Sequence, residues 1–379
     1  MDDRHRLLIV GPRSVSGHEG GVEKFAEEFV NHAAGVADIS VMVLTGDETR
    51  RDVRILKVPA SKLMRTDKAL YLVHAFWRIL TGRYDRVFIL GINFAMLAPL
   101  ARLMGPRGTR VVVRSGSIDH ILAKWGPVMS TVFQVSEKLA RFAHRVVAVT
   151  PSIQKHLATL GIEASVIRNG LARAQREAPV ALAERSRSVL AVGRLTVQKN
   201  YRVLVEAAAL LGDDCPDIAI VGGADNSPEA PMLAALATER GASRVSFMGA
   251  RPREEVLKEM RRHGLFINCS HHEGMSNAVL EAIQEGMPLI LSDIDANRDL
   301  AFPDRFYFDP DAPQGLADKI REAMLDPQAF VVSRELFDDW QTTIGHFCDV
   351  LDIPRPAAGQ QPAVAAVPVS LGDGIRASA

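Results

Sequence analysis

Two glutamates, Glu273 and Glu281, lie in a segment that could bind a small molecule, NCSHHEGMSNAVLEAIQEGMPLILSD. Its apolar start predicts a strand, a polar loop holds Glu273, and Ser276 is a suitable N-cap for a helix that carries Glu281. Ionised carboxylates only accept hydrogen bonds, so they suit hydroxyl donors, whereas amides at a helix start suit an anion. Either glutamate alone would more often be a solvated surface group. The residues whose amides could face the anion are Gly274, Met275, Ser276 and Asn277.

Two cations follow an earlier strand in the sequence VGRLTVQKN. Arg194 comes directly after the strand, and Lys199 precedes the next helix. An arginine offers a fork of donors and a lysine a point charge, a combination that suits a diphosphate. Isolated surface cations are usually solvated, but the end of a parallel strand is where open α/β sheets bind ligands.

A glycine-rich loop, GPRSVSGHEGGVEKF, follows the first predicted strand. Gly20 and Gly21 stand before a helix that begins near Val22, so the backbone could approach an anion closely. The dinucleotide pattern G-x-G-x-x-G is absent and the loop is too long for it. A glycine loop without a ligand explains the same letters.

A further strand end, VVVRSGSIDH, carries Arg114, Ser115, Gly116, Asp119 and His120. A histidine beside a carboxylate could transfer protons near neutral pH, which makes His120 a candidate catalytic residue. A turn capped by the aspartate, with an exposed histidine, is the equally good alternative.

These segments fall within an alternation of short apolar runs and longer helical patterns, which predicts parallel strands joined by crossover helices. Residues 171–186 are charged and break the alternation, so we expect 1–170 and 187–335 to form two Rossmann-like lobes. In the first lobe, strands are predicted at 7–11, 40–44, 86–91, 110–114 and 145–150, with helices at 22–33, 67–80, 94–104, 129–143 and 152–160. In the second, strands are predicted at 188–193, 217–223, 245–249, 265–270 and 288–293, with helices at 200–211, 231–240, 252–262 and 277–286. Further helices are predicted at 313–324 and 336–351.

Composition agrees with two large cores and a small-molecule ligand. The 379 residues are 47% apolar, and 45 basic residues balance 45 acidic ones, so the net charge does not indicate nucleic acid. Three dispersed cysteines fit neither a disulfide framework nor a metal clamp and favour a reducing, cytoplasmic setting. No apolar run is long enough for a spanning helix. The tail 353–379 is rich in Pro, Ala, Gly and Gln and is expected to be disordered.

The chain resembles the family 4 retaining glycosyltransferases of the GT-B fold over about residues 1–310. The resemblance rests on GGVE at 20–23, TPSIQKHL at 150–157, RNG at 168–170, VGRLTVQKN at 192–200 and EGMSNAVLE at 273–281. It implies two Rossmann-like lobes facing across a cleft, with the terminal helix at 336–352 crossing back to the first lobe.

The resemblance also implies roles for single residues. The second lobe would bind a nucleotide-sugar, with Arg194 and Lys199 on the diphosphate and Glu281 on the ribose. Glu273 would lie beside the donor sugar, which the amides of the following loop would contact. The base would lie near Ala250 and Arg251, and the GGVE loop, with Gly20 and Gly21, would close over the phosphates. The leaving phosphate could take the acceptor's proton, so that no metal or other cofactor is required.

One departure from the family pattern concerns the position before Gly116, where many members have a histidine that reaches the donor sugar and this chain has Ser115. Arg168 replaces the usual proline of PNG. A nucleotide-sugar epimerase of the same fold and a catalytically inactive sugar-nucleotide-binding protein are the alternatives. The GGVE and EGMSN pattern favours transfer over the epimerase, and the four charged residues Arg194, Lys199, Glu273 and Glu281 argue against the inactive protein. The missing fingerprint argues against a NAD-dependent dehydrogenase. Asp293 and Asp295 imitate a metal-binding DxD, but too little chain follows them for the fold that uses it.

Residues 64–86, MRTDKALYLVHAFWRILTGRYDR, interleave basic residues with Tyr71, Phe76 and Trp77. Such a helix could rest on the inner face of a membrane and bring a lipid-linked acceptor to the cleft. An ordinary helix with its apolar face in the core is the alternative. With a donor of the UDP-sugar type, the sequence predicts an enzyme of surface polysaccharide or glycolipid assembly.

Overall fold

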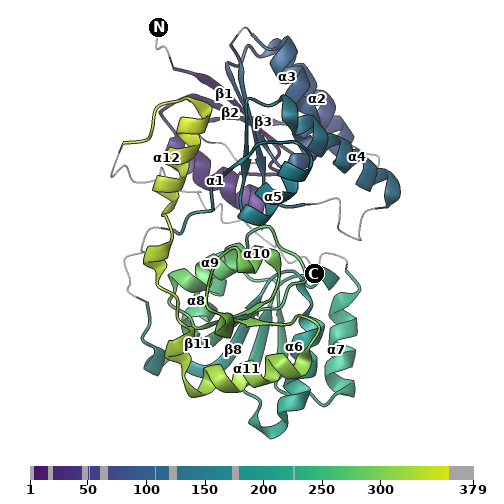
Figure 1. Ribbon diagram of the computed structural model, residues 1–379, viewed down its shortest axis with the longest axis vertical. Coiled ribbons are helices and arrows are strands. Elements are labelled where there is room, and N and C mark those ends of the chain that lie inside the picture. The colour runs from purple at the N-terminus through teal and green to yellow at the C-terminus, as the bar shows by residue number, and fades with distance from the viewer. Residues whose placement is uncertain are drawn as a thin grey trace, which may run out of the picture.

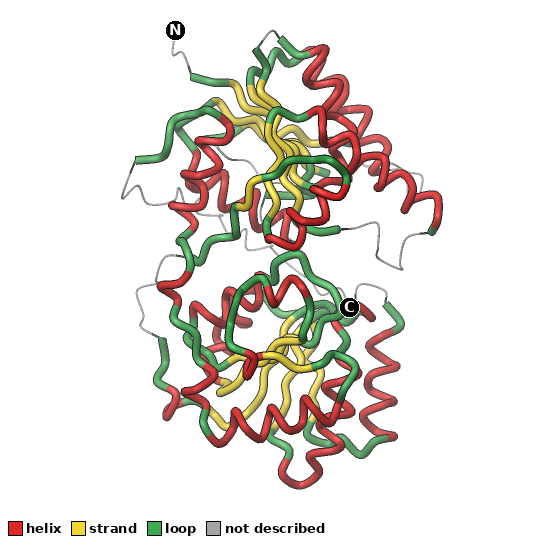
Figure 2. Tube along the Cα trace, in the orientation of Figure 1, coloured by secondary structure: helices red, strands yellow, loops and turns green. Residues whose placement is uncertain are grey.

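The computed structural model has two α/β lobes, one above the other in Figure 1. Each lobe is built around one parallel sheet with helices on both faces, as Figure 2 shows. This is the predicted fold class, since strands buried on both faces are continuous apolar runs. The residues that the structure describes are 4–15, 20–44, 50, 52–59, 67–106, 108–118, 126–172, 179–224 and 227–357.

The first lobe has a seven-stranded sheet in the order β3-β2-β1-β4-β5-β6-β7. Leu8 and Val10 of β1 pack into one buried cluster, and Leu7 and Ile9 pack into another on the opposite face. Its strands are β1 (Arg6–Val10), β2 (Asp38–Val43), β3 (Arg54–Lys57), β4 (Arg86–Leu90), β5 (Arg110–Ser115), β6 (Arg145–Ala148) and β7 (Ser165–Val166). Its helices are α1 (Gly21–Ala33), α2 (Asp67–Thr81), α3 (Ala98–Met104), α4 (Pro127–Leu139) and α5 (Pro151–Thr159), with 3-10 turns at Ile92–Leu97 and Ala140–Phe142.

The second lobe has a six-stranded sheet in the order β10-β9-β8-β11-β12-β13. Its strands are β8 (Ser186–Val192), β9 (Asp217–Val221), β10 (Val245–Gly249), β11 (His263–Asn268), β12 (Leu289–Ser292) and β13 (Tyr307–Phe308). Its helices are α6 (Tyr201–Leu211), α7 (Glu229–Glu239), α8 (Arg253–Arg262), α9 (Asn277–Gln284), α10 (Asp295–Arg298) and α11 (Pro313–Leu325). One buried cluster joins the sheet to these helices.

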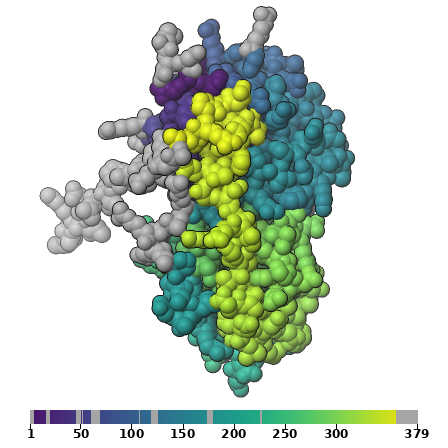
Figure 3. Space-filling view, turned by 60° about the vertical axis from the view of Figure 1, so that its left-hand side comes forward, coloured from purple at the N-terminus to yellow at the C-terminus, as the bar shows by residue number. Residues whose placement is uncertain are grey.

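The last helix, α12 (Trp340–Leu351), packs against α1 of the first lobe. Its Phe347 ring lies 4.8 Å from the ring of Phe25, centroid to centroid. The helix is shorter than the predicted span of 336–351, because the Asp339 side chain accepts a hydrogen bond from Thr342 N and sets the start at Trp340. Figure 3 shows this segment, in yellow, running from the second lobe over the first.

Most predicted strands and helices are confirmed within one to three residues, and the differences are local. The predicted helix at 94–104 is a 3-10 turn followed by α3. The short strands β3, β7 and β13 were missed. The expectation of a disordered tail concerns residues that are largely outside the described part, which ends at 357. Within that part, no helix combines the length and the apolar character needed to cross a bilayer.

Candidate active site

The loops that follow β8 and β11 lie side by side because these two strands are neighbours in the second sheet. His271 N donates to Gln198 O at 2.9 Å, and Gln198 Nε2 donates to His272 O at 2.7 Å. The two loops are thus bound to one another by hydrogen bonds from both sides. This arrangement brings together the two segments that the sequence singled out.

Lys199 and Glu273 meet across these loops, with Nζ 2.5 Å from Oε1. Ser270 Oγ donates to the same oxygen at 2.7 Å, and Asn268 Nδ2 donates to it at 3.3 Å. Burial raises the pKa of Glu273, whereas the Lys199 charge and the three hydrogen bonds lower it. The lowering effects together are larger, so the pKa is below its ordinary value. Glu273 is therefore a fixed carboxylate, and its role beside a donor sugar stays a prediction.

A buried network of polar side chains supports the Glu273 carboxylate through Ser270. Asn297 Nδ2 donates to Ser292 O at 2.9 Å, and Ser292 Oγ donates to Ser270 O at 2.6 Å. Asn297 and Ser292 are buried in the second lobe. Each buried polar group finds a partner, so the network fixes Ser270 and, through it, Glu273. The sequence did not point to Asn297 or Ser292, because only the fold brings them under Glu273.

Arg194 lies on the same loop as Lys199, and its side chain is exposed. The loop makes its turn at Gly193, with a φ of +152°. A Cβ at Gly193 would lie 2.9 Å from Tyr201 Oη and 3.1 Å from Lys199 Cε. Only glycine allows this close packing, which places Lys199 against Glu273 and leaves Arg194 at the surface.

The helix α9 begins at Asn277, with Ser276 at the N-cap position as predicted, although the serine side chain makes no capping hydrogen bond. The preceding loop touches the first lobe. A Cβ built on Gly274 would lie 1.7 Å from Gly116 O, which is the backbone after β5. A larger residue could not occupy position 274 in this arrangement of the lobes. Gly274 is therefore a point of close approach between the loop that follows β11 and the loop that follows β5.

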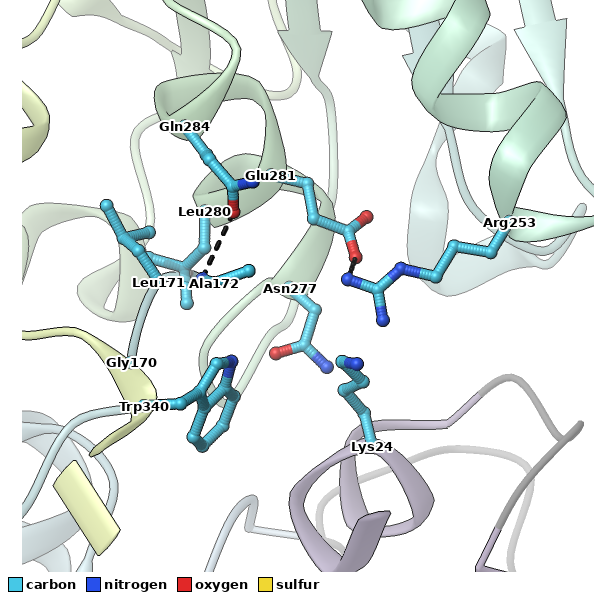
Figure 4. Close-up of a pocket in the computed structure, with 10 residues that line it drawn as sticks. All are labelled: Lys24, Gly170, Leu171, Ala172, Arg253, Asn277, Leu280, Glu281, Gln284 and Trp340. Carbon is cyan, nitrogen blue, oxygen red and sulfur yellow. Dashed lines mark hydrogen bonds and ion pairs between the residues drawn. The ribbon is translucent and has the colours of Figure 1, made fainter. Parts of the chain in front are cut away.

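Glu281 faces a pocket between the lobes and pairs with Arg253 of α8, with Oε1 2.9 Å from Nη2. The pocket is also lined by Lys24 and Asn277, and Figure 4 shows the side chains of Lys24, Asn277 and Arg253 pointing toward one another. Lys24 pairs with Glu28 on its own helix, at 2.5 Å. Sequence reasoning missed Lys24 and Arg253. The signal for Arg253 was the basic cluster ARPR that follows the β10 sequence.

Gly20 and Gly21 begin α1, whose first amides face no side-chain cap. Glu23, in the same GGVE motif, accepts hydrogen bonds from Arg13 N at 3.2 Å and Arg13 Nε at 2.9 Å. This pair ties the loop after β1 to the helix start. The glutamate of GGVE thus fixes the loop, while Gly17 lies outside the described residues.

Ala250 and Arg251 follow β10, the edge strand of the second sheet, and both are exposed. Arg251 Nη1 lies 3.3 Å from Glu255 Oε2, one turn along α8. The structure therefore places Ala250 and Arg251 beyond the carboxyl end of the edge strand β10, close in sequence to Arg253. It does not bring them against Lys199 or Glu273 through any contact of the described residues.

On the first lobe, Ser115 ends β5 and is buried, and its Oγ has no hydrogen-bond partner among the described residues. The candidates Asp119 and His120 lie outside those residues, so the proton-transfer hypothesis for His120 stays a prediction. Asp293 of the DxD-like string pairs with Arg298 through both oxygens, at 2.5 and 2.6 Å. Its carboxylate thus binds an arginine within its own lobe.

Comparison with known proteins agrees with this geometry. Residues 173–336 match the family model described as glycosyl transferases group 1, and residues 19–175 match the model described as glycosyltransferase family 4. A search of curated proteins finds no match.

Solved structures share the fold at low sequence identity. Sucrose-phosphate synthase from Thermosynechococcus elongatus is 18% identical with a TM-score of 0.76, over 92% of this chain and 98% of that one. Anabaena HepE in complex with UDP and glucose is 18% identical with a TM-score of 0.72, over 92% and 99%. The lipopolysaccharide outer core galactosyltransferase WaaB is 19% identical with a TM-score of 0.65, also over 92% and 99%. The two family models adjoin and together span the chain from residue 19 to 336, so this GT-B protein belongs to the family 4, group 1 glycosyltransferases.

Proposed function

We propose that this glycosyltransferase transfers a sugar from a UDP-sugar to a glycan or lipid-linked acceptor, with retention of anomeric configuration. The observation that carries the proposal is the Lys199–Glu273 pair, 2.5 Å apart, in the loops beside the start of α9. A cation, a fixed carboxylate and free helix amides together suit a diphosphate joined to a sugar. The HepE structures contain UDP, UDP and glucose, or UDP-glucose, which supports uracil as the base.

In the proposed mechanism, Lys199, Arg194 and the amides of residues 274–277 stabilise the charge that develops on the departing diphosphate. Preorganised groups of this kind supply much of the rate enhancement in other enzymes. Glu273 positions the sugar hydroxyls, and Glu281 the ribose. In this proposal neither glutamate acts as an acid or a base, because both accept hydrogen bonds from hydroxyl groups of the donor.

Retention follows if the acceptor hydroxyl attacks from the face that the diphosphate leaves. The leaving phosphate then takes the acceptor's proton, the bond from the anomeric carbon to the phosphate oxygen breaks, and the bond to the acceptor oxygen forms. The proposal requires no metal for this step. His120 is retained as a catalytic candidate.

The surface of the first lobe supports an acceptor at an anionic membrane face. On α2, the side chains of Val73, Phe76 and Trp77 are 52%, 38% and 59% exposed. Six basic side chains of the described part of this lobe between residues 69 and 145 are exposed as well, namely Arg78, Arg83, Arg102, Lys138, Arg141 and Arg145. Exposed aromatic groups among basic residues suit the interface of an anionic bilayer. The proposed cytoplasmic location at the inner membrane face rests on this surface.

A screen of nucleotide-sugars for binding and hydrolysis tests the donor proposal. One UDP-sugar that binds and is hydrolysed supports it, and failure of every UDP-, GDP- and ADP-sugar to bind contradicts it.

Flotation with anionic liposomes tests the membrane contact. Wild-type protein is expected to float with the liposomes. Replacing Phe76 and Trp77 with serine is expected to reduce flotation. No flotation combined with full activity on a soluble acceptor would remove the membrane from the proposal.

A further inference from the structure

Arg114 is a buried arginine at the end of β5 with little to compensate its charge. Its side chain is 2% exposed, and its guanidinium lies 4.0 Å from the centroid of the Phe25 ring. Nη2 donates to Asn169 Oδ1 at 2.6 Å, whereas Nε has no acceptor among the described residues. Burial lowers the pKa of Arg114 to about 9. In the described part of the chain, no carboxylate pairs with this cation.

The contrast with another buried arginine of this chain shows how unusual that is. Arg185 donates to the carbonyl oxygens of Met260, His263 and Glu285. Burial lowers the pKa of Arg185 as well, but the Glu285 charge opposes this shift and favours the protonated form. Burying a cation is costly unless it is paired or fully hydrogen-bonded. Arg185 meets that condition, but Arg114 meets it only in part. The buried charge of Arg114 is therefore unfavourable for stability, which points to a role in function.

The neighbours of Arg114 belong to the cleft. Asn169, which it holds, donates through Nδ2 to Asn277 Oδ1 at 3.0 Å, at the start of α9. A Cβ on Gly116 would lie 3.1 Å from Arg114 Nη1, and the carbonyl of Gly116 is the group that Gly274 approaches. Arg114 thus lies directly behind the two loops that meet across the cleft, and it is linked through one amide to the first residue of α9.

We propose that Arg114 is a positioning residue that holds Asn169 against Asn277 and leaves an uncompensated positive charge behind the diphosphate site. This inference rests on the proposed function, because a nucleoside diphosphate is the anion that the charge would favour. The Arg114–Asn169–Asn277 chain places the α9 amides, and the charge adds to their field. The protein accepts a less stable ligand-free state in exchange for a stronger anion site.

Asn169→Asp tests this directly, because it supplies the missing carboxylate at the atom that Arg114 already contacts. The variant is expected to raise the Tm of the ligand-free protein, since a buried charge gains a partner and this gain exceeds the loss of the hydrogen bond from Asn169 Nδ2 to Asn277. It is expected to weaken binding of UDP and of inorganic pyrophosphate about tenfold in calorimetric titrations. A merely structural role would move stability and affinity in the same direction. Asn31→Asp is the matched control, since Asn31 Oδ1 also accepts from an arginine, Arg50, at 2.7 Å. That control should change neither affinity.

Arg114→Lys is the second variant, which keeps the charge and loses the forked contact with Asn169. It should keep pyrophosphate affinity within about threefold and lower turnover. Pyrophosphate affinity equal to wild type in Asn169→Asp overturns the inference, as does a loss of both Tm and affinity in that variant. If wild type binds pyrophosphate but no nucleotide, the proposed donor is wrong while the role of Arg114 is still measured. If it binds neither anion, both proposals are wrong.

Discussion

Lys199 and Glu273 form an ion pair in which the ammonium nitrogen lies 2.5 Å from one carboxylate oxygen. The cation proposed for the diphosphate is thus already neutralised in the ligand-free protein. An incoming diphosphate must share this ammonium with Glu273. The pair keeps Lys199 in place before the donor arrives. It also weakens the affinity for a diphosphate alone, because the diphosphate must compete with Glu273 for the ammonium group.

Glu273→Gln should separate these two effects. Without the carboxylate, Lys199 is free for a diphosphate, so we expect UDP to bind several-fold more tightly. Turnover should fall about 10²-fold or more, because the fixed acceptor for the sugar hydroxyls is lost. Titration with UDP and steady-state turnover measure the two quantities.

Glu206→Gln, which removes a carboxylate from an exposed ion pair with Arg202, is the control and should change neither quantity. A Glu273→Gln variant that binds UDP more weakly would contradict competition for Lys199.

The lowered pKa of Glu273 predicts a pH dependence of stability. A carboxylate with a depressed pKa contributes stability that is complete above its ordinary pKa of 4.5 and is lost as the pH falls through the lowered value. The Tm difference between wild type and Glu273→Gln should therefore be constant above about pH 4.5 and shrink below it. The expected free-energy difference on the plateau is about 1–3 kcal/mol. A difference that grows below pH 4.5 would show that another group dominates.

Glu281→Ala should weaken donor binding about 10- to 100-fold, the amount expected for hydrogen bonds to a charged group. Arg253, which pairs with Glu281 at 2.9 Å, would also be released. Arg253→Ala separates the two contributions, because it keeps the carboxylate. If Glu281 binds the ribose, the arginine variant should have less effect on UDP affinity than the glutamate variant. An unchanged donor affinity in Glu281→Ala would remove the ribose from its role.

Gly274→Ala should impair closure of the lobes. Its Cβ would meet Gly116 O at 1.7 Å, and that oxygen is a backbone atom, so no side chain can move aside. We expect turnover to fall about 10²-fold, because misplacing the reacting groups by 1 Å can have this effect. Small-angle scattering should show a more open molecule. Gly126→Ala is the control, since its Cβ would meet nothing within 4 Å and its φ is −66°. Wild-type turnover in Gly274→Ala would contradict the contact.

The sequence predicted the two lobes because each buried parallel strand is a continuous apolar run that stands out from its helices. It could not predict β3, β7 or β13, whose two to four residues are too short for a pattern. The start of α12 was misplaced because the apolar spacing begins at Leu336, whereas the hydrogen bond from Thr342 to Asp339 decides the boundary.

The candidate site divides in the same way. The sequence identified Glu273, Glu281 and Lys199 as candidates because each lies in a segment that follows a predicted strand and has a side chain suited to binding a ligand. Arg253 was missed although the basic cluster ARPR gave a signal for it. Asn297 was not visible, since its role depends on contacts with Ser292 and Asn268 that only the fold brings about. Arg168 stands where the family usually has a proline, and its Nη2 donates to Asp299 O at 2.7 Å and joins the lobes. Contacts between the lobes leave no periodic signal.

The initial anomer of the released sugar tests the central claim most directly. Wild-type protein is mixed with the UDP-sugar that the screen identifies, without acceptor, and proton NMR follows the sugar before it mutarotates. The account predicts release of UDP together with a sugar that first appears in the anomeric configuration of the donor. First appearance of the opposite anomer would contradict retention, and release of no sugar from any bound UDP-sugar would contradict the donor chemistry itself.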